Sequence, residues 1–360
     1  MPQLFDSLQL RSIVLNNRIA LPPMCQYSAR DGLASDWHFV HYGSRAVGGA
    51  ALMIVEATAV CPEGRISLGD LGLWNDQQIE PLARIARFAQ ALGCVAAVQL
   101  AHAGRKASVG LGWQPQRTLS ADEGGWQPDA PSPLAFGEGY AVPNALDVDG
   151  IRQVITQFAA SARRAREAGF QSVEIHAAHG YLLHQFLSPL SNQRTDTYGG
   201  RFENRTRLVR EVVSAVRAEW PEHLPLLIRL SATDWVDGGW NADETVELCR
   251  GLKLLGVDLV DVSTGGMVPT AKIPVGTGFQ TEYAARVRRE ADIPTAAVGL
   301  IISPTQADHI VRTGQADVVL LGREMLRNPY WALGAAQELG KANAWPQQYL
   351  RAAPAGSPGR

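Results

Sequence analysis

Eight short aliphatic runs recur along the chain, and this repetition limits the possible folds more than any other feature. The runs are dense in Val, Ile, Leu and Ala without strict polar alternation, which is typical of strands buried on both faces. Stretches with helical periodicity separate most of them. The runs lie at residues 18–21, 51–55, 95–100, 173–175, 226–230, 259–262, 295–298 and 318–321, and the helical stretches at 77–92, 151–168, 205–220, 242–255, 282–291 and 305–313.

This alternation of eight strands with helices predicts an α/β fold, a (β/α)8 TIM barrel in which residues 1–360 form one domain. A Gly or Pro precedes many of the strands and marks the turns that lead back into the barrel. An open, doubly wound sheet is the alternative. That fold normally has a Gly-x-Gly-x-x-Gly sequence after its first strand, and the chain has none there.

Three segments lie outside this pattern. Residues 8–17 alternate apolar and polar side chains, which predicts a short hairpin before the first strand. The segment 109–144 after the third strand is long and rich in Gly, Pro and Trp. We expect it to form a lid or partner-contacting loop, with an ordered surface excursion as the alternative. The tail 342–360 is rich in Pro and Ala, which favours an extended C-terminal arm over a helix.

The composition argues against several classes of protein. The formal net charge is −2 and the Lys and Arg residues are spread along the chain, so neither nucleic acid nor a membrane surface is expected as a partner. No apolar run reaches the roughly 18 residues of a membrane-spanning helix, and the N-terminus has no secretion signal. The four cysteines form no Cys-x-x-Cys pair, so no metal site is expected. Such cysteine usage suits a reducing compartment, and we expect a cytoplasmic protein.

Polar residues gather where the predicted strands end, and in TIM barrels the chemistry takes place at the carboxyl ends of the strands. Gly299 follows the seventh strand and Gly322-Arg323 the eighth, the positions where barrels commonly bind a phosphate. Gln99 and Arg229 suit the polar edge of a flavin, because the amide donates and accepts and the guanidinium stabilises negative charge near N1. The sequence therefore predicts a phosphorylated, flavin-like ligand.

The fourth strand ends in two imidazoles and a phenol. His176 and His179 can converge only if the strand stops near His176 and the chain bends, which Gly180 permits. There they would donate hydrogen bonds to one oxygen while Tyr181 supplies a proton. The alternatives are structural loop histidines or a two-histidine corner of a metal site. Cys25, at the end of the first strand, would touch the redox-active part of the flavin, or would be an inert buried thiol.

The strand ends carry a set of longer motifs, in order and over nearly the whole chain. They are Asn17-Arg-Ile, Pro23-Met-Cys-Gln-Tyr27, Glu56-Ala-Thr-Ala, Gln99-Leu-Ala-His-Ala-Gly-Arg-Lys106, His176-Ala-Ala-His-Gly-Tyr181, Phe186-Leu-Ser-Pro-Leu-Ser-Asn192, Arg194-Thr-Asp-Thr-Tyr-Gly-Gly200, Glu203-Asn-Arg205, Arg229-Leu-Ser and Gly322-Arg323. In these motifs the chain resembles the old yellow enzyme family of FMN-dependent ene reductases. It resembles in particular the bacterial branch of that family, which has a cysteine near the flavin.

The resemblance implies an enzyme that reduces the C=C bond of α,β-unsaturated carbonyl or nitro compounds, with NADPH or NADH as the hydride donor to FMN. His176 and His179 would hold the substrate oxygen, and Tyr181 would protonate the substrate after hydride transfer from FMN N5. Tyr27 and Lys106 would line the substrate pocket. The implied FMN-binding residues are Pro22, Pro23, Met24, Cys25, Ala57, Gln99, Arg229, Gly322 and Arg323, in addition to Gly299 from the phosphate argument.

The resemblance also implies an assembly. In this branch an arginine of the C-terminal tail can reach the active site of a neighbouring subunit, and Arg351 has the matching position, so a homodimer or homotetramer is expected. The segment 109–144 is shorter in some relatives, which leaves its conformation and the substrate size open. Two other classes of protein are alternatives: a barrel lyase without flavin, using the histidines and Lys106, and a flavin-binding protein without catalysis. The first has no carboxylate at metal-ligand spacing, and the second needs no His-His-Tyr set.

Overall fold

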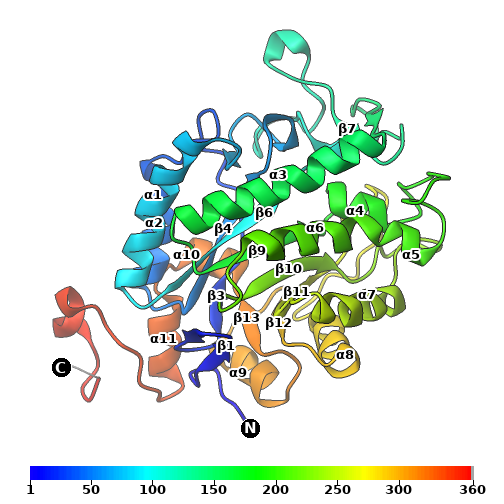
Figure 1. Ribbon diagram of the computed structural model, residues 1–360. Helices are drawn as coiled ribbons and strands as arrows, with labels where there is room; N and C mark the ends of the chain where they lie inside the picture. The colour runs from blue at the N-terminus through cyan, green and yellow to red at the C-terminus, as the bar shows by residue number, and fades with distance from the viewer. Residues whose placement is uncertain (358–360) are drawn as a thin grey trace.

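The computed structural model describes residues 1–357, and eight parallel strands within them close into a barrel (Figure 1). β3 pairs with β13 on one side and with β4 on the other, and this pairing closes the cylinder. The (β/α)8 prediction is confirmed. The barrel strands are β3 (Ile19–Leu21), β4 (Leu52–Ala59), β6 (Val95–Ala101), β9 (Ser172–Ala177), β10 (Leu226–Ser231), β11 (Leu259–Ser263), β12 (Thr295–Val298) and β13 (Val318–Leu320).

Helices surround the barrel and connect its strands (Figure 1). Each predicted helical stretch is present, and several begin at a side-chain cap that satisfies a free main-chain N–H: Asp147 accepts from Gly150 N, and Ser303 from Gln306 N. The helices are α1 (Asp36–Val47), α2 (Ile79–Ala91), α3 (Val148–Glu167), α4 (Leu182–Leu187), α5 (Phe202–Arg205), α6 (Arg207–Glu219), α7 (Ala242–Leu254), α8 (Thr281–Ala291), α9 (Pro304–Arg312), α10 (Gly322–Arg327) and α11 (Trp331–Glu338).

Two features of the strands and helices differ from the sequence expectation. The second barrel strand continues beyond residue 55, because a register shift between Val55 and Thr58 lets β4 pass through Glu56 and Ala57 and still pair with β6. Helix α1 was not among the clearest predicted helices. Its sequence includes aromatic residues, a histidine pair and a glycine, which have low helix propensity, and its stability comes from packing against α2 and β4.

The N-terminal end of the barrel is closed by an apolar hairpin, as predicted. β1 (Leu8–Leu10) pairs antiparallel with β2 (Ile13–Leu15), and Arg11 occupies the turn with φ 51°. Leu10 and Leu15 pack with the first residues of the barrel strands, among them Val95, Leu227 and Leu259. This end of the molecule therefore has a closed, apolar core.

The long segment after β6 is ordered and attached to the barrel (Figure 1). Val109 bridges both Ser67 and Thr118. Trp126 donates from Nε1 to the carbonyl of Glu63 at 2.8 Å, and the guanidinium of Arg65 lies 4.9 Å from its ring centroid. Its function as a lid stays a prediction. The short elements are β5 (Leu71–Gly72), β7 (Asp129–Ala130), β8 (Asn144–Ala145) and the 3₁₀-helices η1 (Pro62–Gly64), η2 (Asp76–Gln78), η3 (Gly104–Lys106), η4 (Ala121–Glu123) and η5 (Gln347–Ala352).

The C-terminal tail runs beyond α11 at the side of the molecule (Figure 1), and its residues 342–348 lie beside the N-terminal end of the barrel. The expectation of an extended conformation is wrong for η5 (Gln347–Ala352). Pro346 precedes this turn with φ −55°, a value that suits a helix start. The last part of the arm, 358–360, lies outside the described residues. No helix in the described chain is long and apolar enough to cross a membrane.

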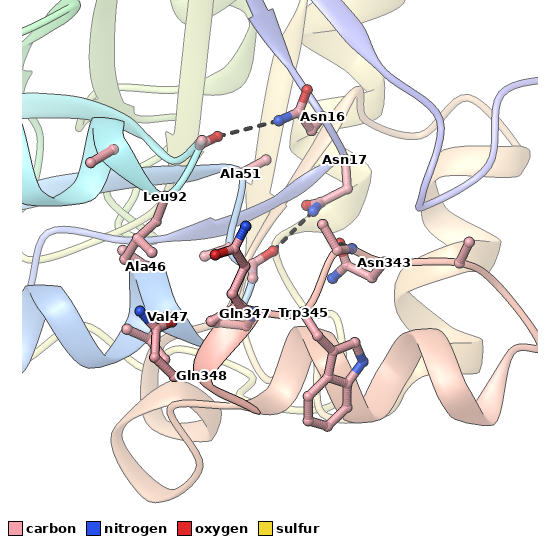
Figure 2. A pocket seen from close by; sticks show the side chains of 17 residues that line it. Asn16, Asn17, Ala46, Val47, Ala51, Leu92, Asn343, Trp345, Gln347 and Gln348 are labelled. Carbon is pink, nitrogen blue, oxygen red and sulfur yellow. Dashed lines mark hydrogen bonds between the residues drawn. The ribbon is translucent and has the colours of Figure 1, made fainter. Parts of the chain in front are cut away.

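The tail and the barrel enclose a hollow of about 560 Å³ at the N-terminal end of the strands. Figure 2 shows that residues preceding three barrel strands line one side, with Asn16 donating to Gly93 O and Asn17 to Gly49 O. Asn343, Trp345 and Gln347 of the tail line the other side. Because active sites of TIM barrels form at the opposite end, this hollow is separate from the candidate site.

Candidate functional site

The two histidines and the tyrosine come together at the end of β9. The strand ends at Ala177, and His179 and Gly180 then adopt positive φ values of 58° and 71°. The ring of His176 lies edge-on to that of His179 at 5.3 Å and to that of Tyr181 at 5.0 Å between centroids. A Cβ at Gly180 would lie 2.1 Å from the carbonyl oxygen of Gly266, so only glycine allows this turn.

A buried histidine and a buried aspartate lie against the turn. His184 accepts the N–H of Gly180 on Nδ1 at 2.9 Å, and its Nε2 lies 3.0 Å from Asp234 Oδ1. The other carboxylate oxygen of Asp234 accepts from Ser188 Oγ and from the N–H of Trp240. His184 and Asp234 are fully buried, and the hydrogen bonds to His184 Nδ1 and Asp234 Oδ2 offset part of the cost of burying them. The sequence analysis did not identify this pair.

Lys106 supports the same turn from the open side. Its Nζ donates to the carbonyls of His179 at 2.8 Å and Gly266 at 3.2 Å. The ammonium also lies 4.9 Å from the ring centroid of Tyr181 and 4.6 Å from that of Phe136, which places a cation over both aromatic faces. Burial and the nearby Arg105 lower its pKa to about 8. Lys106 is therefore held against the turn and does not project freely into solvent.

The protonation states suit hydrogen-bond donation and proton transfer. Burial lowers the pKa of both His176 and His179 well below the usual value, and Arg229 adds to the effect, so both rings are neutral at pH 7. His176 Nδ1 accepts the N–H of Ala178 at 3.3 Å, which leaves the ring proton on Nε2. Burial raises the pKa of Tyr181 well above the usual value, so its phenol carries the proton that it would transfer.

The centre of the barrel mouth contains a buried polar network. Gln99 donates from Nε2 to Glu174 Oε1 at 2.8 Å, and Arg229 Nε lies 2.9 Å from Asp261 Oδ2. Burial raises the pKa of Glu174 to about 8 and that of Asp261 to about 6. Glu174 and Asp261 were missed. A carboxylate in the middle of each aliphatic run was the signal, because such a residue in a buried strand needs a partner.

The segment after β3 presents apolar surface at this mouth. Pro22 is buried, whereas Pro23, Met24 and Cys25 are partly exposed. Glu56 Oε2 accepts the N–H of Gln26 at 2.6 Å and holds the segment in place. Burial raises the pKa of Cys25 well above the usual thiol value, so the side chain is a neutral thiol. Ala57 lies on β4 at the strand irregularity described above.

Tyr27 follows on the outer side of the mouth, with a positive φ of 52°. Its ring meets Trp113 of the long segment edge-on, with centroids 5.8 Å apart. Gly112 permits this approach, because a Cβ there would lie 2.5 Å from the Tyr27 ring. Trp113 is itself largely exposed. Sequence reasoning did not identify Trp113, whose only signal was an aromatic residue in a Gly-rich loop.

A small hollow of about 200 Å³ lies at the ends of β12 and β13. Gly299, with φ 125°, Gly322 and the exposed Arg323 line it together with Gln280. An opening of this kind with a guanidinium at its edge suits a phosphate. The apolar surface of the β3 segment, the amide of Gln99 and the guanidinium of Arg229 have the chemistry that the ring and the polar edge of FMN would require, and this hollow has the chemistry that its phosphate would require.

Arg351 is not brought to this site. It lies on the exposed turn η5, where Tyr349 packs on Tyr330 at 6.2 Å between ring centroids. Within residues 1–357, no hydrogen bond, ion pair or ring contact joins Arg351 to the residues of the barrel mouth. In the same part of the chain, no group of three or more His, Cys, Asp or Glu side chains could hold a metal ion.

Comparison with known proteins gives a consistent result. Residues 3–342 match the NADH:flavin oxidoreductase / NADH oxidase family. The NADPH dehydrogenase of Listeria monocytogenes serotype 4a (strain HCC23) is 45% identical over 354 residues, which are 98% of this chain and 99% of that protein. The NADPH dehydrogenase of Geobacillus sp. (strain WCH70) is 46% identical over 350 residues, covering 97% and 98%.

Two solved structures show the same fold and share more than a quarter of the aligned sequence. Morphinone reductase has a TM-score of 0.77 at 29% identity, covering 96% of this chain and 92% of that one. The old yellow enzyme homologue from Zymomonas mobilis has a TM-score of 0.79 at 26% identity, covering 96% and 94%. The chain therefore belongs to the NADH:flavin oxidoreductase / NADH oxidase family, the old yellow enzyme family, and is an FMN-dependent NAD(P)H oxidoreductase.

Proposed function

We propose that this enzyme is an ene reductase, which reduces the C=C bond of α,β-unsaturated carbonyl or nitro compounds. The observation that carries the proposal is the convergence of two neutral imidazoles and a neutral phenol on one turn at the barrel mouth. An oxidoreductase that only passed electrons from NAD(P)H to oxygen would not need hydrogen-bond donors and a proton donor beside each other. A metal-dependent lyase has no support, because within residues 1–357 no three His, Cys, Asp or Glu side chains lie together so that they could hold a metal ion.

His176 and His179 bind the substrate oxygen. When bound, FMN supplies the hydride, which it takes from NADPH or NADH. As the hydride reaches the β-carbon, negative charge develops on the carbonyl or nitro oxygen, and preorganised donors stabilise that charge. Both rings are neutral, so each has one N–H to donate. The buried His184–Asp234 pair and Lys106 hold the turn, so the rings need little rearrangement.

Tyr181 transfers its phenolic proton to the α-carbon. A general acid must keep its proton at the working pH and lie within reach of the reacting atom. The first condition is supported by the raised pKa of Tyr181, and the second by the contact of its ring with His176. The ammonium of Lys106 over the ring favours the phenolate that forms, because a cation stabilises the negative charge.

The remaining candidate residues bind the cofactor and shape the pocket. Gln99 and Arg229 would contact the polar edge of the flavin, and Gly299 with Arg323 its phosphate. Cys25 would lie against the ring, as in the cysteine-containing branch, and Tyr27 would contact the substrate. The complete proposed FMN site is Pro22, Pro23, Met24, Cys25, Ala57, Gln99, Arg229, Gly299, Gly322 and Arg323.

The tail is proposed to complete the site of a neighbouring subunit. Arg351 is exposed and lies apart from the barrel mouth of its own chain, so it is free to reach a partner's site, as the resemblance to the cysteine-containing branch implies. This requires at least a homodimer, and a homotetramer satisfies it equally.

The segment 109–144 would act as a lid through Trp113 and its contact with Tyr27. A cytoplasmic location stays a prediction.

The proposal is tested by an anaerobic visible spectrum of the purified enzyme. We expect flavin bands that bleach with NADPH and return on addition of 2-cyclohexenone. Bands that bleach but return only with oxygen would leave an NADPH dehydrogenase and remove the ene reductase. A saturated ketone of the same size, cyclohexanone, is the control, and it should not restore the bands.

A further inference from the structure

The proposed function requires both histidines to donate, and the two rings obtain their proton positions in different ways. The tautomer of His176 depends on the main chain, through the N–H of Ala178. That of His179 depends on a side chain, because His179 Nε2 lies 2.7 Å from Ser263 Oγ. Ser263 is the last residue of β11 and is buried. No role for Ser263 was predicted from the sequence.

The contact with Ser263 leaves one nitrogen of His179 for a ligand. Nδ1 has no hydrogen bond to any residue in the described part of the chain. A neutral imidazole has a single N–H, so Nδ1 donates only if Nε2 accepts. The direction of the Ser263 hydroxyl proton therefore decides whether His179 is a donor or an acceptor toward the substrate.

Two acceptors compete for that proton. One is His179 Nε2 at 2.7 Å and the other is Gln280 Oε1 at 3.3 Å. Hydrogen bonds from a hydroxyl to an oxygen usually span about 2.5–3.0 Å, so the contact with Gln280 is long, whereas the contact with His179 is the shorter of the two. In addition, Gln280 Oε1 already accepts from Thr264 Oγ1 at 2.7 Å.

The orientation of Gln280 is itself determined by the main chain. Its Nε2 donates to the carbonyl of Val298 at 3.0 Å, which turns Oε1 toward Ser263 and Thr264. That oxygen has two lone pairs, so Thr264 does not block it, but Thr264 makes the shorter bond and leaves Gln280 Oε1 the weaker acceptor for the Ser263 hydroxyl.

We propose that Ser263 is a positioning residue: its hydroxyl donates to His179 Nε2 and keeps the ring proton on Nδ1, the nitrogen that faces the substrate oxygen. The part that concerns the substrate rests on the proposed function, whereas the tautomer itself does not. The pair of histidines then donates from two different atoms, Nε2 of His176 and Nδ1 of His179. Thr264 contributes indirectly, because its bond to Gln280 Oε1 weakens the competing acceptor.

The tautomer can be measured without substrate, by ¹⁵N NMR of the FMN-loaded enzyme with labelled histidine. The His179 signals are assigned by their loss in His179→Gln. We expect a protonated Nδ1 in the wild type and a shift to protonated Nε2 in Ser263→Ala, which removes the donor. Ser263→Thr retains the hydroxyl and should retain the wild-type pattern.

Two further variants separate the proposal from a general structural effect. Ser231→Ala is the matched control, because Ser231 Oγ accepts the main-chain N–H of His179 at 2.9 Å and does not touch the ring. It should leave the tautomer unchanged. Thr264→Val frees Gln280 Oε1, so we expect the Ser263 proton to turn toward Gln280 and a part of His179 to become protonated on Nε2.

The functional consequence is measured by binding of 4-hydroxybenzaldehyde, followed through the flavin absorbance. Loss of one donor should weaken binding of the phenol about tenfold in Ser263→Ala, and Ser263→Thr should restore it. A wild-type His179 protonated on Nε2, or an unchanged tautomer in Ser263→Ala, would overturn the proposal. If the tautomer shifts as expected while the wild type fails to reduce enones, the proposed function fails and the role of Ser263 stands.

Discussion

The two ends of the barrel bury very different side chains. At the N-terminal end, Leu10 and Leu15 of the hairpin pack against Val95, Leu227 and Leu259 in a purely apolar cluster. At the C-terminal end, charged and polar side chains are buried just as deeply, including Glu174, His176, Arg229 and Asp261. Burial of apolar groups stabilises the fold, whereas burial of polar groups costs free energy unless each group has a partner.

The partners at the C-terminal end are arranged to hold reactive groups in place. Arg229 lies against Asp261, Gln99 donates to Glu174, and the turn after β9 is tied to His184 and Lys106. The comparison teaches that one end of the barrel supplies stability and the other supplies chemistry. Substitutions at the two ends should therefore separate, with effects on unfolding at one end and on catalysis at the other.

The largest effect is expected from the double substitution His176→Ala with His179→Ala. One donor to a developing oxyanion is worth roughly 10²–10³ in kcat, so reduction of 2-cyclohexenone should fall by at least about 100-fold. Reduction of the flavin by NADPH should continue. Stopped-flow measurement of the two half-reactions gives both rates, and unimpaired enone turnover would remove the assigned role.

Tyr181→Phe should slow the oxidative half-reaction by about 10²-fold or more, because a positioned general acid contributes roughly 10²–10⁴. The reductive half-reaction should change little. Both rates come from the same stopped-flow experiment. Equal slowing of the two half-reactions would mean that Tyr181 only packs.

At the other end, Leu15→Ala should lower the free energy of unfolding by about 2–5 kcal/mol, because it leaves a cavity in a closed apolar cluster. The enone turnover of the folded enzyme should not change. Val14→Ala is the matched control, since Val14 is 47% exposed on the same strand. A loss of turnover in folded Leu15→Ala would contradict the idea that the N-terminal end of the barrel contributes stability and not catalysis.

Lys106→Met tests whether the active end also contributes stability. The carbonyls of His179 and Gly266 lose their donor, which should cost about 1–3 kcal/mol in denaturant unfolding. The pKa of Lys106 is about 8, so the ammonium is present below that pH and lost above it. The wild-type oxidative half-reaction should decline as pH rises through about 8, and this decline should be absent in the variant.

The smallest effect is expected from truncation after Gln347, which removes Arg351. If Arg351 reaches a neighbouring site, KM for the enone should rise a few-fold or the assembly should change. Light scattering and steady-state kinetics measure the two. Arg351→Ala in the full-length chain distinguishes loss of the guanidinium from loss of the tail. A fully active monomer after truncation would end the subunit-bridging proposal.

Much of the fold followed from the residues alone. A strand buried on both faces is mostly aliphatic, so each barrel strand could be recognised as an aliphatic run in the sequence. The sequence of helix α1 shows a weaker helical pattern, because the helix is stabilised by packing and not by helix propensity. The 3₁₀ turn of the tail was missed for a related reason: a single turn is too short to produce a periodic pattern.

The candidate reactive residues were also predicted from the chain, because a His, a Tyr or an Arg at the end of an aliphatic run is not needed there for packing. The residues that contact these side chains were not predicted. His179 meets Ser263 across 84 residues of chain, and Lys106 meets His179 across 73. Sequence spacing does not report such contacts.

The sequence was thus sufficient to predict the (β/α)8 fold, the end of the barrel that carries the site and the candidate reactive side chains, since each depends on a local sequence pattern. The contact of His179 with Ser263, that of Lys106 with Gly266 and the pairing of Glu174 with Gln99 emerged only on folding. The physical reason is that protonation and hydrogen bonding depend on burial and on distances between strands, and only the closed barrel sets both.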